Sequence, residues 1–96
     1  MLEIRQTDVF ADWFAGLRDR EARARVTVRI RRLSFGNPRD VKPVGGGVSE
    51  MRIDYGPGYR VYFVWRGDTV VVLLCGGDKR NQDRDIARAL ELAREV

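Results

Sequence analysis

The sequence predicts a single α+β domain over residues 1–96, in which a helical hairpin packs on a small, mainly antiparallel sheet. Three observations support this prediction. Between Val48 and Cys75, apolar side chains alternate with charged ones through three consecutive segments, the period of two typical of strands with one buried face. Two segments of helical periodicity precede these strands and a third follows them. A chain of 96 residues with 44% hydrophobic content can bury one core, so we expect the order β-α-α-β-β-β-α.

The first half of the chain predicts a short edge strand and two helices. Residues 2–5 alternate as a strand does, and Thr7 is a typical N-cap for the first helix. Asp19 can cap a second helix, which Gly36 ends. We expect each helix to pack through its apolar stripe, which comprises Val9, Phe10, Trp13, Phe14 and Leu17 in the first and Ala22, Val26, Ile30 and Leu33 in the second.

Residues 36–47 contain three consecutive glycines and show no periodicity, so we expect them to form a loop of about a dozen residues. The glycines precede a strand, whereas a phosphate-binding loop leads into a helix after Gly-Lys-Ser or Gly-Lys-Thr, so that kind of nucleotide site is excluded. Long loops in compact domains are often functional, and Lys42 is the candidate residue that this loop supplies.

Two turns set the expected strand register. The sequence Gly56-Pro57-Gly58 predicts a hairpin with Asp54 opposite Arg60 and Arg52 opposite Tyr62. A second, two-residue turn at residues 67–68 would place Trp65 opposite Val70, Phe63 opposite Val72 and Gly76 beside Tyr59.

In this register one face of the sheet is apolar and the other is exposed and polar. The exposed face is expected to carry Arg52, Arg60, Tyr62 and Arg66, with Asp78, Lys79 and Arg80 emerging beside it. Arg60 and Asp54 could also form no more than a cross-strand ion pair, which contributes little at a surface. A last helix follows, capped by Asn81 or Asp83, with the apolar stripe Ile86, Ala89, Leu90 and Ala93.

The composition limits the possible chemistry. Histidine is absent and Cys75 is the one cysteine, which excludes triad hydrolases, disulfide frameworks and metal sites built from these residues. The net charge of +4, with all but two of the 18 basic residues being arginine, indicates a polyanionic partner. The arginines of the second helix have two interpretations: a solvated helix face, or a groove wall that touches RNA backbone or an acidic partner. The chain has no signal peptide or membrane segment, so we expect a cytoplasmic protein.

Four stretches of the sequence resemble the RelE/ParE toxin superfamily, and most closely its HigB-like, phage Gp49-like branch of addiction module killer proteins. They are residues 41–44 (Val-Lys-Pro-Val), 48–53 (Val-Ser-Glu-Met-Arg-Ile), 58–63 (Gly-Tyr-Arg-Val-Tyr-Phe) and 73–79 (Leu-Leu-Cys-Gly-Gly-Asp-Lys), the last leading into Gln82–Ile86. The resemblance covers nearly the whole chain. It implies a RelE-like fold and the toxin of a type II toxin–antitoxin system.

The resemblance also implies partners and a reaction. The partners would be a cognate antitoxin, often a helix-turn-helix protein, operator DNA through that antitoxin, and the ribosome with its messenger RNA. The reaction would be cleavage of that RNA by its own ribose 2′-OH, with no metal or other cofactor. The matching catalytic positions are Arg52, Arg60, Asp78 and Lys79, and the RNA-binding candidates are Lys42, Tyr62, Arg66 and Arg80. Some superfamily members use a histidine at the site, and this chain has no histidine that could correspond to it.

The residues themselves are compatible with this chemistry. In-line attack at a phosphate needs positive charge at the developing oxyanion, a proton acceptor for the 2′-OH and a proton donor for the 5′ oxygen. Arg52 and Arg60 suit the first role and Lys79 suits proton transfer, while Asp78 or Glu50 could be the base. Two alternatives remain open: a non-enzymatic DNA gyrase inhibitor of the ParE kind, and an inactive protein that binds only its antitoxin.

Overall fold

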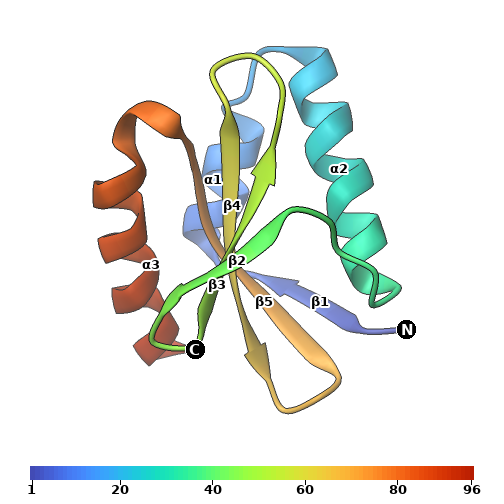
Figure 1. Cartoon of the computed structure of the whole chain (residues 1–96), viewed down its shortest axis with the longest axis vertical. Helices are drawn as coiled ribbons and strands as arrows, with labels where there is room; N and C mark the ends of the chain where they lie inside the picture. Colours follow the sequence, from blue (N-terminus) through green and yellow to red (C-terminus); the bar gives the residue numbers. More distant parts are fainter.

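The computed structural model describes residues 1–96 and confirms the α+β class, with one sheet enclosed between helices (Figure 1). The sheet has the order β1-β5-β4-β3-β2; β1 runs parallel to β5 and the other pairs are antiparallel. The helices are α1 (Asp8–Ala15), α2 (Arg20–Ser34) and α3 (Gln82–Glu95), and a 3₁₀ turn, η1 (Lys79–Asn81), precedes α3. The strands are β1 (Glu3–Gln6), β2 (Val41–Gly45), β3 (Val48–Ile53), β4 (Tyr59–Arg66) and β5 (Val70–Asp78).

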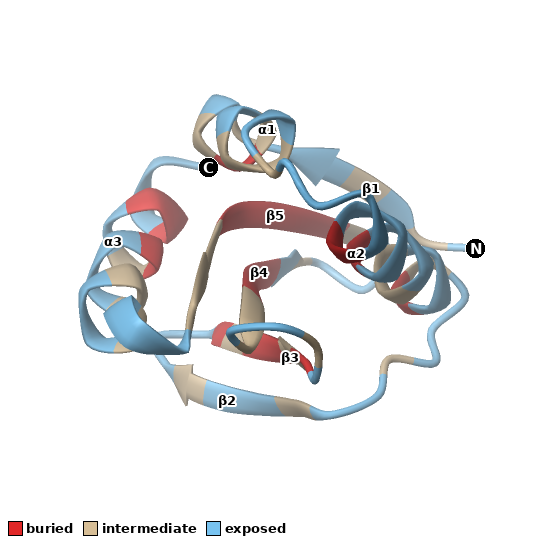
Figure 2. Cartoon of the chain, turned by 90° about the horizontal axis from the view of Figure 1, so that it is seen from above, coloured by how far each residue is buried: buried red, intermediate tan, exposed pale blue.

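Helices cover both faces of the sheet, and each face has its own apolar core (Figure 2). Side chains of α1 and α2 pack on one face around Phe10, Val26, Met51 and Phe63. Helix α3 packs on the other face through Ala89, Leu92 and Ala93, against strand residues that include Val48, Val64, Val72 and Leu74. The central strands β4 and β5 are therefore buried from both sides.

The predicted caps of the first two helices are confirmed, whereas Asn81 precedes α3 without a capping hydrogen bond from its side chain. The Thr7 side chain accepts a hydrogen bond from the Phe10 amide, and the Asp19 side chain accepts bonds from the Glu21 and Ala22 amides. Gly36 adopts a φ of 78° just after α2, where its amide donates to the Leu33 carbonyl. These local contacts fix where each helix begins and ends.

The expectation of a loop over residues 36–47 is wrong in part, because Val41–Gly45 form the edge strand β2. This strand pairs with β3 through Val41–Met51 and Lys42–Glu50, and the glycines turn the chain with positive φ angles. Only Val41 and Val44 are partly buried, so the strand is held mainly by its backbone pairing, which leaves little hydrophobic periodicity to detect. The order is thus β-α-α-β-β-β-β-α.

The predicted register of the β3–β4 hairpin is wrong by two residues, because Arg60 lies opposite Arg52 rather than Asp54. Arg52 lies opposite Arg60, and Ile53 lies opposite Tyr59, so the connecting loop spans residues 54–58. Asp54 is therefore outside the ladder and forms no ion pair with Arg60. The hairpin is shifted by an even number of residues, so the predicted apolar residues still face α1 and α2.

The predicted register of β4 with β5 is also wrong. The loop contains three residues rather than two, which places Trp65 opposite Val71, and a bulge then shifts the ladder so that Gly76 lies opposite Val61. The bulge frees the carbonyl of Leu74, which accepts a hydrogen bond of 2.6 Å from the Thr7 hydroxyl. Thr7 thus caps α1 and also donates the hydrogen bond that the Leu74 carbonyl accepts at the bulge.

Candidate functional site

Three of the predicted site residues meet in a cleft of about 310 Å³ at the end of the sheet where β3 ends and η1 begins. The loop between β3 and β4 at this end of the sheet is at the top of Figure 1. The cationic residues of the cleft are Arg52, Arg60 and Lys79, which come from three separate elements. Its remaining lining residues are Asp40, Ile53, Asp54 and Gly58. We call this hollow the sheet-end cleft.

Arg52 is held in place by Asp40. The Asp40 Oδ1 atom accepts hydrogen bonds from Nε and Nη2 of Arg52, at 3.0 and 2.6 Å, and the Asp40 carbonyl accepts a bond from the Arg52 amide. Asp40 has a φ of 51° and is the one non-glycine residue with a positive φ, a conformation that Asp tolerates better than most residues. Arg52 is thereby oriented and its charge is partly neutralised.

Arg60 has no such partner. It lies between Arg52 on β3 and Gly77 on β5, it forms no ion pair, and its Nε atom is buried without a hydrogen-bond acceptor. Like charges directly opposite each other destabilise a strand pair. An anion in the sheet-end cleft would relieve this repulsion between the two guanidinium groups.

Lys79 reaches the cleft from η1, and it is exposed. The β3–β4 loop packs closely against it, because a side chain on Gly58 would come within 3.5 Å of the Lys79 Cβ atom. Gly58 also has a φ of 82°, which disfavours any other residue. The loop therefore closes one side of the sheet-end cleft.

Asp78 and Glu50, the two carboxylates considered as a base, do not line the cleft. Asp78 caps η1: its side chain accepts bonds from the amide and the guanidinium of Arg80, which hold the pKa of Asp78 below its ordinary value. Arg80 itself is exposed outside the cleft. Glu50 is completely buried, and its Oε2 atom accepts bonds of 2.9 Å from the Tyr62 hydroxyl and 2.8 Å from the Gln82 amide group.

The expectation that Tyr62 and Arg66 lie on an exposed sheet face is wrong, because α3 covers that face. Tyr62 is completely buried, and its burial together with the bond to Glu50 raises the pKa of its hydroxyl. Arg66 lies at the opposite end of α3 from Lys79, where it donates to the carbonyls of Ala93 and Val96. Of the other predicted RNA contacts, Lys42 is exposed on the edge strand β2.

Asp40 is a residue of this region that the sequence did not indicate, and Arg29 was expected only as one of the second-helix arginines that could form a groove wall. Arg29 reaches from α2 to donate a hydrogen bond of 2.6 Å to the Arg52 carbonyl. Both residues are more than ten positions away from Arg52 in the sequence, and local sequence patterns do not predict contacts between residues so far apart. The structure contains no group of three or more His, Cys, Asp or Glu side chains that could hold a metal ion. None of its helices is both long enough and apolar enough to cross a membrane.

Comparison with known proteins shows the family of the chain. Residues 12–95 match the family model of the phage derived protein Gp49-like family (DUF891). The chain is also 46% identical over 95 residues to an uncharacterized protein of Haemophilus influenzae, a match that covers 99% of this chain and 96% of the relative. The chain therefore belongs to the Gp49-like family, a toxin-like family of the RelE/HigB type.

Proposed function

We propose that this chain is the toxin of a type II toxin–antitoxin pair and that it cleaves messenger RNA on the ribosome without a metal ion. Membership of a toxin-like family implies an antitoxin partner. The observation that carries the nuclease proposal is the opposed pair Arg52 and Arg60 in an open cleft, with Lys79 beside them. A phosphodiester is the anion that such a site fits, because guanidinium groups bind phosphate oxygens through paired hydrogen bonds.

The two arginines would have different parts in the reaction. Arg60, which has no counter-charge, binds the scissile phosphate and stabilises the charge that develops during in-line attack. Arg52, oriented by Asp40, is the second donor to the same phosphate. Removal of one such donor typically costs ~10²–10³-fold in rate.

Proton transfer would fall to the groups that line the cleft. Lys79 is the donor to the 5′ leaving oxygen. Glu50 is sealed under α3 and Asp78 is bound by Arg80, so neither is placed to take the 2′ proton. Asp40 is bound to Arg52, which leaves Asp54, an exposed residue of the cleft wall, as the proton acceptor.

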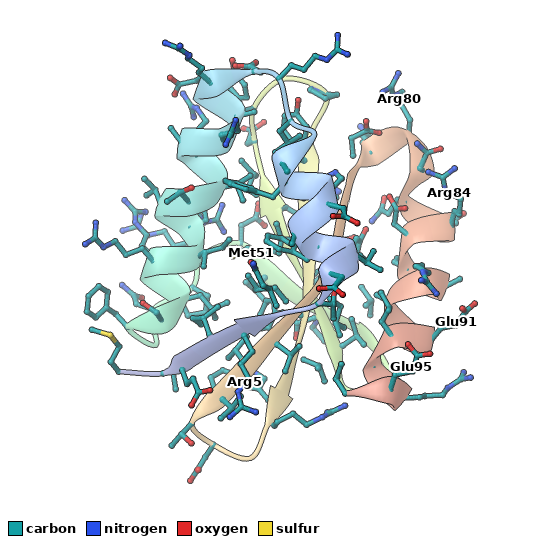
Figure 3. All side chains as sticks on the ribbon, turned by 180° about the vertical axis from the view of Figure 1, so that it is seen from behind. Arg5, Met51, Arg80, Arg84, Glu91 and Glu95 are labelled. Carbon is teal, nitrogen blue, oxygen red and sulfur yellow. The ribbon has the colours of Figure 1, made fainter.

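The test is primer extension on cellular messages after brief expression of the wild-type protein, the Arg60→Ala variant and the Arg5→Ala variant. Arg5 is a matched control because it is an exposed arginine on β1, far from Arg80 and the adjoining cleft (Figure 3). We expect new 5′ ends within translated frames for the wild type and Arg5→Ala. For Arg60→Ala we expect these ends to decrease by at least ~10²-fold.

Two results would contradict the proposal. If soluble Arg60→Ala protein cuts as well as Arg5→Ala, the sheet-end cleft is not the site. If growth stops while all messages stay intact, the target is a protein such as DNA gyrase, and the opposed arginines belong to a docking surface.

A further inference from the structure

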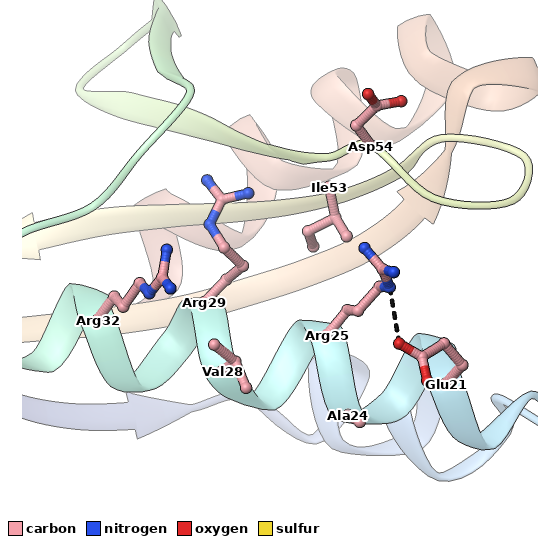
Figure 4. Close-up of a pocket in the computed structure, with 8 residues that line it drawn as sticks. All are labelled: Glu21, Ala24, Arg25, Val28, Arg29, Arg32, Ile53 and Asp54. Atoms are coloured by element: carbon pink, nitrogen blue, oxygen red, sulfur yellow. Dashed lines mark hydrogen bonds and ion pairs between the residues drawn. The ribbon is translucent and has the colours of Figure 1, made fainter.

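A second basic hollow adjoins the sheet-end cleft. It lies between α2 and the end of β3, has a volume of about 370 Å³, and is shown in Figure 4. Arg25, Arg29 and Arg32 project into it from successive turns of one face of α2, and Val28 and Ile53 supply apolar surface. We call it the α2 groove.

The three arginines of the groove are engaged to different degrees. Arg25 is fixed, because it pairs with Glu21 at 2.9 Å and stacks over the ring of Tyr55. Arg32 forms no ion pair or side-chain hydrogen bond, so its charge is available to a ligand. An anion bound in the hollow would form a favourable ion pair with this exposed guanidinium.

Arg29 supplies a second, independent observation. One of its nitrogens donates to the Arg52 carbonyl, whereas Nε and Nη2 are buried with no acceptor. Burial lowers the pKa of this guanidinium, because its charge is partly removed from water. A phosphate oxygen is the kind of acceptor that these donors lack.

The groove and the cleft share a wall formed by Ile53 and Asp54. A chain of phosphates that occupies the cleft can therefore continue around the end of β3 into the groove. An acidic protein segment would also meet the arginines, but nothing would require it to begin at the cleft. The continuity of the two basic hollows, rather than the wall itself, whose Asp54 is acidic, thus favours a ligand whose charges repeat along a strand.

We propose that the α2 groove binds the backbone of single-stranded RNA next to the phosphate held in the sheet-end cleft. One phosphate lies against Arg29 and Arg32, and the neighbouring base or ribose packs on Val28, which is 48% exposed. This proposal rests on the proposed function, since it extends the same RNA strand beyond the cleavage site.

The test measures binding of a 2′-O-methyl RNA oligonucleotide by fluorescence anisotropy over a series of salt concentrations. This probe lacks the attacking hydroxyl, so it reports binding whether or not the protein cleaves RNA. Arg32→Ala is compared with Arg31→Ala, which removes the same charge from the adjacent exposed residue outside the groove. We expect about tenfold weaker binding for Arg32→Ala. Its slope of log K against log salt should fall by about 0.7, the value for one phosphate contact on a single strand.

A parallel measurement uses ribosomes with and without messenger RNA in the decoding site. A defect of Arg32→Ala that needs the message supports the proposal. An equal defect without the message would overturn it, because the strand that continues from the cleavage site is the messenger RNA. Equal effects of Arg31→Ala and Arg32→Ala would overturn the proposal, as would the absence of binding to oligonucleotide and ribosome alike. It would also fall if Arg32→Ala weakened only the complex with the purified antitoxin. A failure of the nuclease proposal would appear separately, in primer extension.

Discussion

Two carboxylates lie where α3 meets the sheet, Glu50 on β3 and Asp85 on α3, and each has one oxygen that is buried and lacks a hydrogen bond. Glu50 is anchored through its other oxygen by Tyr62 and Gln82, which ties β3 and β4 to the first residue of α3. Asp85 sits over Gly77, and burial raises the pKa of its carboxyl above the ordinary value. Buried charges of this kind cost stability, so a small change in charge should be measurable.

Asp85→Asn should raise the free energy of unfolding at neutral pH by on the order of 1 kcal/mol, because the neutral amide removes the cost of burying a carboxylate charge. A carboxyl whose pKa is raised in the folded state stabilises the fold below its unfolded pKa of about 3.9, and this contribution is lost as the pH rises through the folded pKa. The gain from Asn should therefore be present at pH 7 and disappear near pH 3. Urea unfolding at a series of pH values measures it.

The control for this prediction is Asp83→Asn, an exposed residue of the same helical turn. Negative charge is favourable at a helix N-terminus, so this variant should be slightly less stable than the wild type at pH 7. An Asp85→Asn variant that loses stability at pH 7 as the control does would show that the helix dipole, rather than burial, dominates at Asp85.

At the scale of elements, two glycines at the end of β5 let helices approach both faces of the sheet. A side chain on Gly76 would overlap the Trp13 ring of α1, and a side chain on Gly77 would overlap the Asp85 carboxylate of α3. Successive strand residues point to opposite faces, so Gly76 makes room for α1 and Gly77 makes room for α3. This accounts physically for the Gly76-Gly77 sequence just before the site residues.

Gly77→Ala should destabilise the protein by ~1–3 kcal/mol, the usual cost of overpacking. Much of this loss should be recovered when the substitution is made in an Asp85→Ala background, because the overlapping carboxylate is then gone. Gly76→Ala is the matched control, and its cost should be the same in both backgrounds. Thermal unfolding of the six proteins completes the cycle, and an unchanged cost of Gly77→Ala in the Asp85→Ala background would contradict the contact.

At the scale of the whole molecule, the two cores share one sheet and should unfold together. Trp13 reports on the core under α1 and α2. Cys75 reports on the core under α3, where burial raises the pKa of its thiol to about 12 and so suppresses its reactivity.

We therefore expect two measurements to give the same urea midpoint: the fluorescence of Trp13 and the extent of Cys75 labelling. Both are made in a Trp65→Phe variant, which removes the second tryptophan. Coincident transitions would establish one cooperative unit. Labelling of Cys75 at a lower urea concentration than the fluorescence change would instead show that α3 detaches on its own.

Local signals in the sequence were sufficient for much of the fold. The caps Thr7 and Asp19 and the end of α2 at Gly36 were predicted and confirmed, because each depends on neighbours within a few residues. The strands after Val48 were predicted, but their single buried face was not confirmed: β4 and β5 are buried on both faces, and Val72 and Leu74 face α3 rather than the side of Phe63. The strand registers were wrong, because a bulge and two loop lengths decide them. Strand β2 was missed because backbone pairing, rather than a buried face, holds it.

The candidate site, like the fold, could be predicted from the sequence only in part. The sequence by itself determined which charges are present and that Arg52, Arg60 and Lys79 lie near one another, since residue type and strand order decide both. Only the tertiary structure decided that α3 buries Tyr62 and Glu50, that Asp40 orients Arg52, and that the arginines of α2 line a groove beside the cleft. These are contacts between residues far apart in the chain, and they depend on how whole elements pack, which no local pattern encodes.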